Sequence, residues 1–170
     1  MPSSEHARPR VLARLRCYSS AVLKLFAAAA LVFLIACGGA DELPGGRVAG
    51  NGMAPALPEG AYFEYQEPDT VEVGDIVAFE MAVDGVQRGF IKRVVAVAGQ
   101  TVEVADGVVL VDGVPLDESG YVATAPQYTV PATEVAADHV YVLGDNRDDS
   151  IDSHDFGPVP VSSIHGVVVD

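Results

Sequence analysis

The stretch VADGVVLVDGV, residues 104–114, places an Asp-Gly pair twice within a run of valines. Asp-Gly tolerates the positive φ angles of a two-residue hairpin turn, so each pair predicts a reversal between two strands. Other short runs rich in Val, Ile and aromatic residues, bounded by Gly, Asp or Pro, predict further strands. These runs are DIVAFEMAV (75–83), GFIKRVVAVAG (89–99), QTVEVADG (100–107), VVLVDGVPL (108–116) and HVYVLGD (139–145). Many short strands joined by turns predict an all-β fold, either a barrel or a sandwich.

The first 37 residues differ in composition from the rest of the chain. They hold five of the ten basic residues but one of the 24 acids, followed by an apolar run of twelve residues from Leu25 to Ala36. A bilayer span takes about 20 apolar residues, so this run is short for a membrane anchor. A basic stretch, a short apolar run and then small residues follow the order of an export signal. We expect a short N-terminal hydrophobic helix there.

The apolar run ends in LIAC (34–37), which resembles the bacterial lipobox. This resemblance implies cleavage before Cys37 and lipidation of that cysteine, and an uncleaved signal anchor is the alternative. Residues 38–47, GGADELPGGR, have no apolar periodicity and predict a flexible tether. The sequence thus predicts a leader (1–37), a tether (38–47) and a domain (48–170) held at the membrane on the extracytoplasmic side.

Charge and cysteine content argue against several classes of partner. After residue 37 the chain has five basic residues against 23 acidic ones, a surface that repels the phosphates of nucleic acids. The same part has no cysteine, which excludes disulfides and thiolate metal sites. The acidic run DNRDDSIDSHD (145–155) fails the calcium-loop pattern, because its third residue is Arg and its sixth is Ser. We expect no metal and no cofactor.

Histidines give no alternative site. His139 and His165 have no partners at metal-ligand spacing. Ser150, Asp152 and His154 are too close in sequence to form a Ser/His/Asp triad, which assembles from distant segments. We therefore interpret His154 as a loop or surface residue.

Four segments have the sequence and the order of the successive boxes of bacterial type I signal peptidases. They are GNGMAPAL (50–57), VGDIVAF (73–79), GFIKRVVAVAGQTVEV (89–104) and YVLGDNRDDSIDSHDFGPVP (141–160). The chain thus resembles serine peptidases of family S26 over roughly residues 48–170. The resemblance implies an antiparallel, signal-peptidase-like β domain at the outer face of a membrane. It also implies a Ser/Lys dyad that cuts exported precursors after small-x-small sequences.

Lys92 matches the general base of this dyad. In the strand FIKRVV, alternate residues share a face, so Lys92 lies with Phe90 and Val94 while Arg93 faces the other way. Burial between apolar side chains lowers the pKa of a lysine towards neutrality, as a base for a serine hydroxyl requires. Ser150 matches the family serine that hydrogen-bonds this lysine and orients it.

The resemblance also implies a supporting loop around the dyad. Its members match Asp145, Arg147, Asp152 and Arg93. An ion pair between Asp152 and Arg93 is the expected brace. His154 stands where the family usually has arginine, which weakens this brace. Asp149 stands where asparagine is usual, and an added acid near Lys92 raises the pKa of the lysine.

The first box departs from the family at its nucleophile. The family pattern is roughly Ser-Gly-Ser-Met-x-Pro-Thr-Leu, its second serine is the nucleophile, and Gly52 stands at that position. Gly50 and Ala56 replace two further hydroxyl residues, and residues 21–69 contain no Ser or Thr. Loss of a nucleophile typically costs roughly 10⁶ in kcat. The resemblance still implies a groove for an extended peptide, lined by Gly50, Asn51, Met53 and Pro55.

Three functions follow as hypotheses. The first is a signal peptidase-like protein that has lost cleavage and binds exported peptides or a partner peptidase at the membrane. The second is an active peptidase with an atypical nucleophile or a water activated by Lys92, or one in which Gly52 is a sequence error. The third is a structural envelope lipoprotein. We expect the first, because Lys92, Ser150, Asp145 and Met53 persist and a structural role would not require them.

Overall fold

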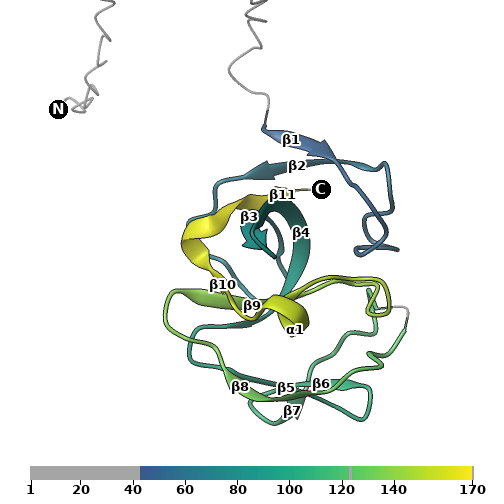
Figure 1. The fold of residues 1–170 in the computed structure, drawn as a ribbon, viewed down its shortest axis with the longest axis vertical. Coiled ribbons are helices and arrows are strands. Elements are labelled where there is room, and N and C mark those ends of the chain that lie inside the picture. Colours follow the sequence, from purple (N-terminus) through teal and green to yellow (C-terminus); the bar gives the residue numbers. More distant parts are fainter. Residues whose placement is uncertain (1–42, 123, 170) are drawn as a thin grey trace, which may run out of the picture. The chain divides into compact units, whose positions relative to one another are not determined.

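The computed structural model describes residues 43–122 and 124–169, which form a nearly all-β unit (Figure 1). The strands are β1 (Gly45–Arg47), β2 (Tyr62–Gln66), β3 (Ile76–Val83), β4 (Val86–Val97), β5 (Thr101–Ala105), β6 (Val108–Val111), β7 (Val114–Pro115), β8 (Val130–Glu134), β9 (His139–Leu143), β10 (Val159–Pro160) and β11 (Ile164–Val169). Two short helical segments, α1 (Ser153–Phe156) and the 3₁₀ turn η1 (Val161–Ser163), separate the last strands. The predicted all-β class is confirmed.

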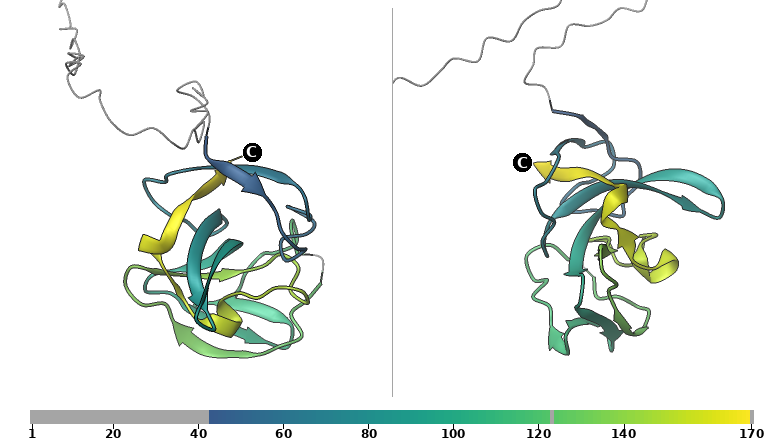
Figure 2. Two further views of the ribbon diagram at one scale, coloured as in Figure 1. Left: turned by 45° about the horizontal axis from the view of Figure 1, so that its top comes forward. Right: turned by 90° about the vertical axis from the view of Figure 1, so that its left-hand side faces the viewer.

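The strands form two antiparallel sheets. One sheet has seven strands in the order β1-β2-β11-β3-β4-β9-β10, and the other has four in the order β7-β6-β5-β8 (Figure 1). The long hairpin β3–β4 lies in the middle of the larger sheet, and its tip projects past the neighbouring strands (Figure 2). This projection arises because β9 pairs with β4 only from Arg93 onward.

The two predicted Asp-Gly turns are confirmed. Asp106 and Gly107 have φ angles of 51° and 77°, and they join β5 to β6 with Ala105 facing Val108. The second pair, residues 112–113, joins β6 to β7 in the same way. A third pair, residues 84–85, was missing from the prediction and closes the β3–β4 hairpin with φ angles of 53° and 76°. Positive φ at both central residues is the type I′ geometry that matches strand twist.

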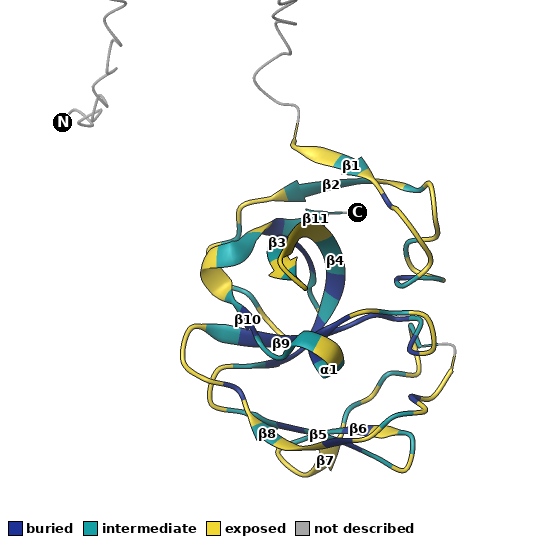
Figure 3. Ribbon diagram, in the orientation of Figure 1, coloured by how far each residue is buried: buried dark blue, intermediate teal, exposed yellow. Residues whose placement is uncertain are grey.

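Two apolar clusters meet at β4 and β9. One cluster joins the smaller sheet to these strands through residues such as Val95, Val102 and Leu143. The other packs β3 and α1 against the opposite faces of the same strands, through Val94 and Val142 among others. Successive residues of a strand point to opposite faces, so β9 and the second half of β4 are buried on both sides (Figure 3). Lys92 lies in this buried second half of β4.

One predicted boundary needs correction. Residues 45–47 were predicted to belong to a flexible tether, but they form β1, which pairs antiparallel with β2. The reason is backbone hydrogen bonding to a neighbouring strand, which the Gly-rich composition does not reveal. The predicted hydrophobic helix, the leader and Cys37 lie outside the described residues. Within residues 43–122 and 124–169, no helix has the length and apolarity needed to cross a membrane.

Candidate active site

Lys92 is buried on β4, with 7% of its surface exposed. Its predicted face is confirmed: Phe90 and Val94 pack in the apolar cluster beneath it, and Nζ lies 5.9 Å from the centre of the Phe90 ring. Burial lowers the pKa of Lys92, while the charges of Asp152 and Asp145 act to raise it. The charges that act to raise the pKa of Lys92 thus come from Asp152 and Asp145, whereas the sequence had suggested Asp149.

Gly52 faces this amine from the first-box loop. A Cβ atom added at Gly52 would lie 3.2 Å from Lys92 Nζ and 3.5 Å from Ser150 Oγ. The backbone at Gly52 does not have the positive φ of the left-handed region, so other residues can adopt it. The carbonyl of Gly52 accepts a hydrogen bond from the backbone N–H of Asn146 (3.1 Å). The fold thus brings together the two positions matched to the dyad, Gly52 and Lys92, and the serine matched to the lysine-orienting position, Ser150.

Ser150 occupies a closely packed corner beside Gly52. Its Oγ is buried and has no hydrogen-bond partner among the described residues. Gly144 makes this approach feasible, because a Cβ at that position would overlap both the Ser150 side chain and the Gly52 carbonyl. Ser150 and Lys92 therefore both border the position that a side chain at residue 52 would fill.

The first-box loop is held by its own backbone. Met53 is 2% exposed, and its carbonyl accepts a hydrogen bond from the N–H of Leu57 (2.8 Å). The N–H of Ala54 donates to the carbonyl of Asn51 (2.9 Å). Of the predicted groove residues, Gly50, Asn51 and Met53 do line the groove described below. Pro55 is exposed and is not among the residues that line it.

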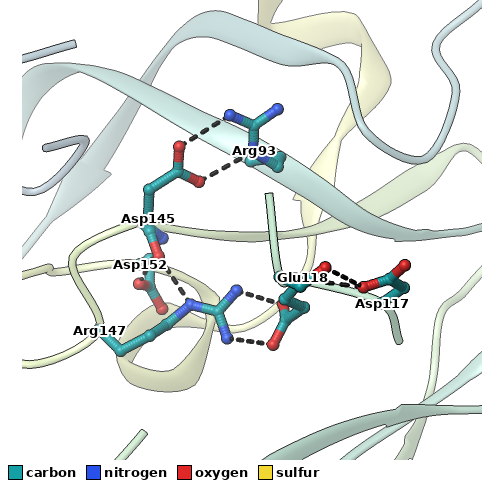
Figure 4. Close-up of polar contacts among 8 residues, drawn as sticks. Arg93, Asp117, Glu118, Asp145, Arg147 and Asp152 are labelled. Carbon is teal, nitrogen blue, oxygen red and sulfur yellow. Dashed lines mark hydrogen bonds and ion pairs between the residues drawn. The ribbon is translucent and has the colours of Figure 1, made fainter. Parts of the chain in front are cut away.

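Arg93 pairs with Asp145, and the predicted pair with Asp152 was wrong (Figure 4). Nε and Nη2 of Arg93 donate to the two carboxylate oxygens of Asp145 at 2.8 and 2.7 Å, and Nη1 donates to the carbonyl of Gly74. The guanidinium also lies 4.2 Å from the centre of the Tyr121 ring. This bidentate pair fixes the start of the loop that follows β9.

Arg147 holds the middle of the same loop. Its Nε donates to the carbonyl of Gly144 (2.8 Å), and its guanidinium forms an ion pair with Glu118 (Figure 4). The sequence prediction missed Glu118, because it lies 29 residues away in a segment without a recognisable pattern.

Asp152 caps helix α1. Its carboxylate accepts hydrogen bonds from the N–H of Gly144 (2.9 Å) and from the N–H and Nδ1 of His154, the latter at 2.7 Å. The Asp155 side chain accepts from the Asp152 N–H in return, which completes a capping box. Ligand atoms of Asp152, His154 and Asp155 lie within 4.8 Å of one another, as in a metal site. The bonds just described already engage them, so the cluster acts as a helix cap.

His154 is half-buried and stacks on Tyr128, with ring centres 3.9 Å apart. The hydrogen bond to Asp152 raises the pKa of His154, against the opposing effect of burial. A histidine whose pKa is raised in the folded state adds stability below its ordinary pKa of about 6.5. This contribution is lost as the pH rises through the folded-state pKa.

His154→Gln is therefore expected to lower Tm by a few degrees more at pH 6 than at pH 9. Thermal unfolding followed by circular dichroism measures this difference. His165→Gln, an exposed position on β11, is the control and should shift Tm equally at both pH values. An equal shift at both pH values for His154→Gln would contradict a charged pair with Asp152.

A groove of about 1090 Å³ opens in front of Lys92. Its lining comes from residues 45, 47–53, 63, 65, 78–80, 88–92, 148–151 and 165. Residues 88–91 of β4 pair with β3 along one edge, and along the other edge they have no neighbouring strand among those described, because β9 pairs with β4 only from Arg93 onward. The groove thus combines an unpaired strand edge with Gly52, Lys92 and Ser150 on its wall.

Comparison with known proteins finds relatives of this chain. A family model described as signal peptidase, peptidase S26, matches residues 19–169. Probable signal peptidase I-1 of Synechocystis sp. is 40% identical over 132 residues, which cover 70% of this chain and 65% of that protein. Signal peptidase I of Leptolyngbya laminosa is 41% identical over 102 residues, which cover 56% and 50%.

A solved signal peptidase I from Enterococcus faecalis is 30% identical, covers 59% of this chain and 98% of its own, and superposes with a TM-score of 0.46. The chain spans about 50–65% of the length of the two curated relatives. The family match covers most of the chain. This chain belongs to the signal peptidase family, peptidase S26.

Proposed function

We propose that this chain is a signal peptidase-like protein that keeps the lysine base and the peptide groove and has lost peptide-bond cleavage. The observation that carries the proposal is the position of Gly52. A side chain there would begin 3.2 Å from the Lys92 amine and beside Ser150 Oγ. A serine at residue 52 would thus have its base at hand, and glycine offers no oxygen to attack a carbonyl.

Lys92 is suited to the role of general base. A buried lysine next to apolar groups holds its proton less tightly, and Phe90 and Val94 supply these groups. In this proposal Ser150 orients the amine, while Arg93, Asp145, Arg147 and Asp152 position the loop that carries Ser150. With residue 52 lacking a hydroxyl, the base has nothing to deprotonate except water.

The groove suits a peptide in extended conformation. Residues 88–91 of β4 offer free backbone groups on one side, so a bound peptide would add a strand there. Ala78, Ile91 and Met53 give the wall an apolar character in which small side chains fit. The relatives are named signal peptidases, so we assign an exported precursor or its signal peptide as the ligand.

The predicted leader supports binding at a membrane. A lipidated Cys37, or an uncleaved anchor, would hold the domain at a membrane on its extracytoplasmic side. There it would meet precursors as they emerge, and a partner peptidase could complete their cleavage.

A binding assay tests the proposal. A fluorescently labelled signal peptide is titrated with the full-length chain in detergent and followed by anisotropy, and the peptide is then analysed for cleavage. We expect saturable binding and an intact peptide. Ile151→Glu, at an exposed apolar residue of the groove wall, should weaken binding at least several-fold.

Val114→Glu is the matched control for this variant. Val114 is also exposed and apolar, but it lies on β7 in the other sheet and does not line the groove. This variant should bind as tightly as the natural chain. Absence of binding by the natural chain would favour the structural lipoprotein instead, and cleavage would favour an active peptidase that uses water or another nucleophile.

A further inference from the structure

The Lys92 amine borders open space without a partner. Lys92 is buried, with 7% of its surface exposed. None of the side-chain hydrogen bonds or ion pairs within residues 43–122 and 124–169 involves it. Its amine lies against Gly52, which has no side chain, and it forms part of the groove wall. Lys92 is also the only lysine after residue 24.

We propose that Lys92 is a covalent binding site for small aldehydes, which its amine captures reversibly as an imine. The site combines three features of the described residues: an unpaired amine, the space left by glycine at residue 52, and an opening into the groove. The proposal concerns the amine itself and stands whether or not the chain cleaves peptides.

Imine formation requires a neutral amine, because the nitrogen lone pair must attack the carbonyl carbon. The surroundings of Lys92 favour that form: burial lowers its pKa, and Phe90 and Val94 offer no charge to hold the proton. The charges of two nearby acids, Asp145 and Asp152, act to raise the pKa of Lys92, but both carboxylates already accept hydrogen bonds from other residues. Asp145 is paired with Arg93, and Asp152 accepts bonds from the helix cap and His154.

The reaction is balanced without a further reagent. The Lys92 nitrogen forms a bond to the aldehyde carbon, and one N–H proton passes to the carbonyl oxygen to give a carbinolamine. Loss of that oxygen with a second N–H proton releases one water and leaves a C=N bond. Ser150 Oγ, which has no partner among the described residues and lies 3.5 Å from the position of a Cβ at residue 52, is the hydroxyl that would donate a hydrogen bond to the oxygen.

The room beside the amine sets the size of the ligand. A Cβ at residue 52 would lie only 3.2 Å from Nζ, so any residue other than glycine would crowd the amine on this side. An aldehyde on a small aliphatic group would reach the amine from the groove, which also accommodates a longer chain. Gly52 is therefore part of the proposed site.

Reductive trapping with propanal tests the site. The full-length chain, made by cell-free synthesis so that the leader with Lys24 is retained, is treated in detergent at pH 7 with propanal and cyanoborohydride. The adduct at each lysine is followed over time by peptide mass spectrometry. Lys24 serves as the internal reference amine. We expect Lys92 to be propylated several-fold faster, because burial lowers its pKa and its amine has no hydrogen-bond partner among the described residues.

Two variants locate the effect. Gly52→Ser should slow the reaction at Lys92 several-fold and leave Lys24 unchanged, because a side chain fills the space and its hydroxyl engages the amine. Lys92→Met should abolish the fast adduct while Lys24 still reacts. Equal rates at the two lysines of the natural chain would overturn the proposal. An unchanged rate in Gly52→Ser, with folding verified by circular dichroism, would overturn the part assigned to Gly52.

Discussion

Gly52→Ser is expected to cleave a signal-peptide substrate that the natural chain leaves intact. The Cβ of this serine would lie 3.2 Å from Lys92 Nζ, so a hydroxyl on it is within reach of its base after small adjustments. Loss of a nucleophile costs roughly 10⁶ in kcat, and restoring it should recover a gain of at least about 10² even with imperfect geometry. Chromatography of a synthetic substrate in detergent measures the rate.

Two controls separate the hydroxyl from its surroundings. Gly52→Ala adds the same Cβ without the oxygen and should remain inactive. Gly52→Ser combined with Lys92→Met should lose the gained activity, because an apolar side chain of similar length cannot remove the serine proton. Activity in Gly52→Ala equal to that of Gly52→Ser would show that the restored hydroxyl is not the nucleophile.

Arg93→Met is expected to destabilise the fold by about 3–5 kcal/mol, the usual cost of removing one partner of a buried ion pair. Asp145 is fully buried, and both of its carboxylate oxygens accept hydrogen bonds from Arg93. The variant leaves this carboxylate without its charge partner and also frees the carbonyl of Gly74. Urea unfolding followed by circular dichroism gives the difference in free energy of unfolding.

Arg88→Met is the matched control for this loss. Arg88 lies on the same strand, is exposed, and makes no ion pair with the described residues. Its replacement should change the free energy of unfolding by no more than about 0.5 kcal/mol. Equal effects of the two substitutions would mean that the Arg93–Asp145 pair does not stabilise the fold.

Local features of this fold were predictable from the sequence. Alternation along FIKRVV placed Lys92 with Phe90 and Val94, because the side-chain period of a strand is fixed. Asp-Gly pairs marked tight turns because both residues tolerate positive φ. The pair at residues 84–85 carried the same signal and could have been recognised, although polar residues follow it.

The partner of Arg93 was not predictable by proximity in sequence. Asp145 and Asp152 both flank the same loop, and which of them reaches Arg93 depends on where the loop turns. Asp152 is committed to the helix that begins at Ser153, and the spacing to Asp155 is a capping pattern that the sequence did contain. A helix of four residues is too short for its apolar periodicity to reveal it.

Contacts between distant segments had no sequence signal. Glu118 pairs with Arg147, and Tyr128 stacks on His154, yet both come from the irregular segment between β7 and β8. Such contacts depend on how the chain folds back after the smaller sheet, and neither composition nor periodicity records this path. The family resemblance identified the dyad positions, Gly52 and Lys92, and the orienting serine, Ser150. Only the structure gives the distances from residue 52 to Lys92 and Ser150.

The most direct test of the account is the turnover of the natural chain itself. Release of the mature end of a signal-peptide substrate is measured over many hours for three samples: the natural chain, its Lys92→Met variant and a detergent blank. The account predicts the same rate in all three, because the base faces a residue without a hydroxyl. Turnover by the natural chain that exceeds the blank and disappears in Lys92→Met would contradict it and would establish a peptidase that works without a serine at residue 52.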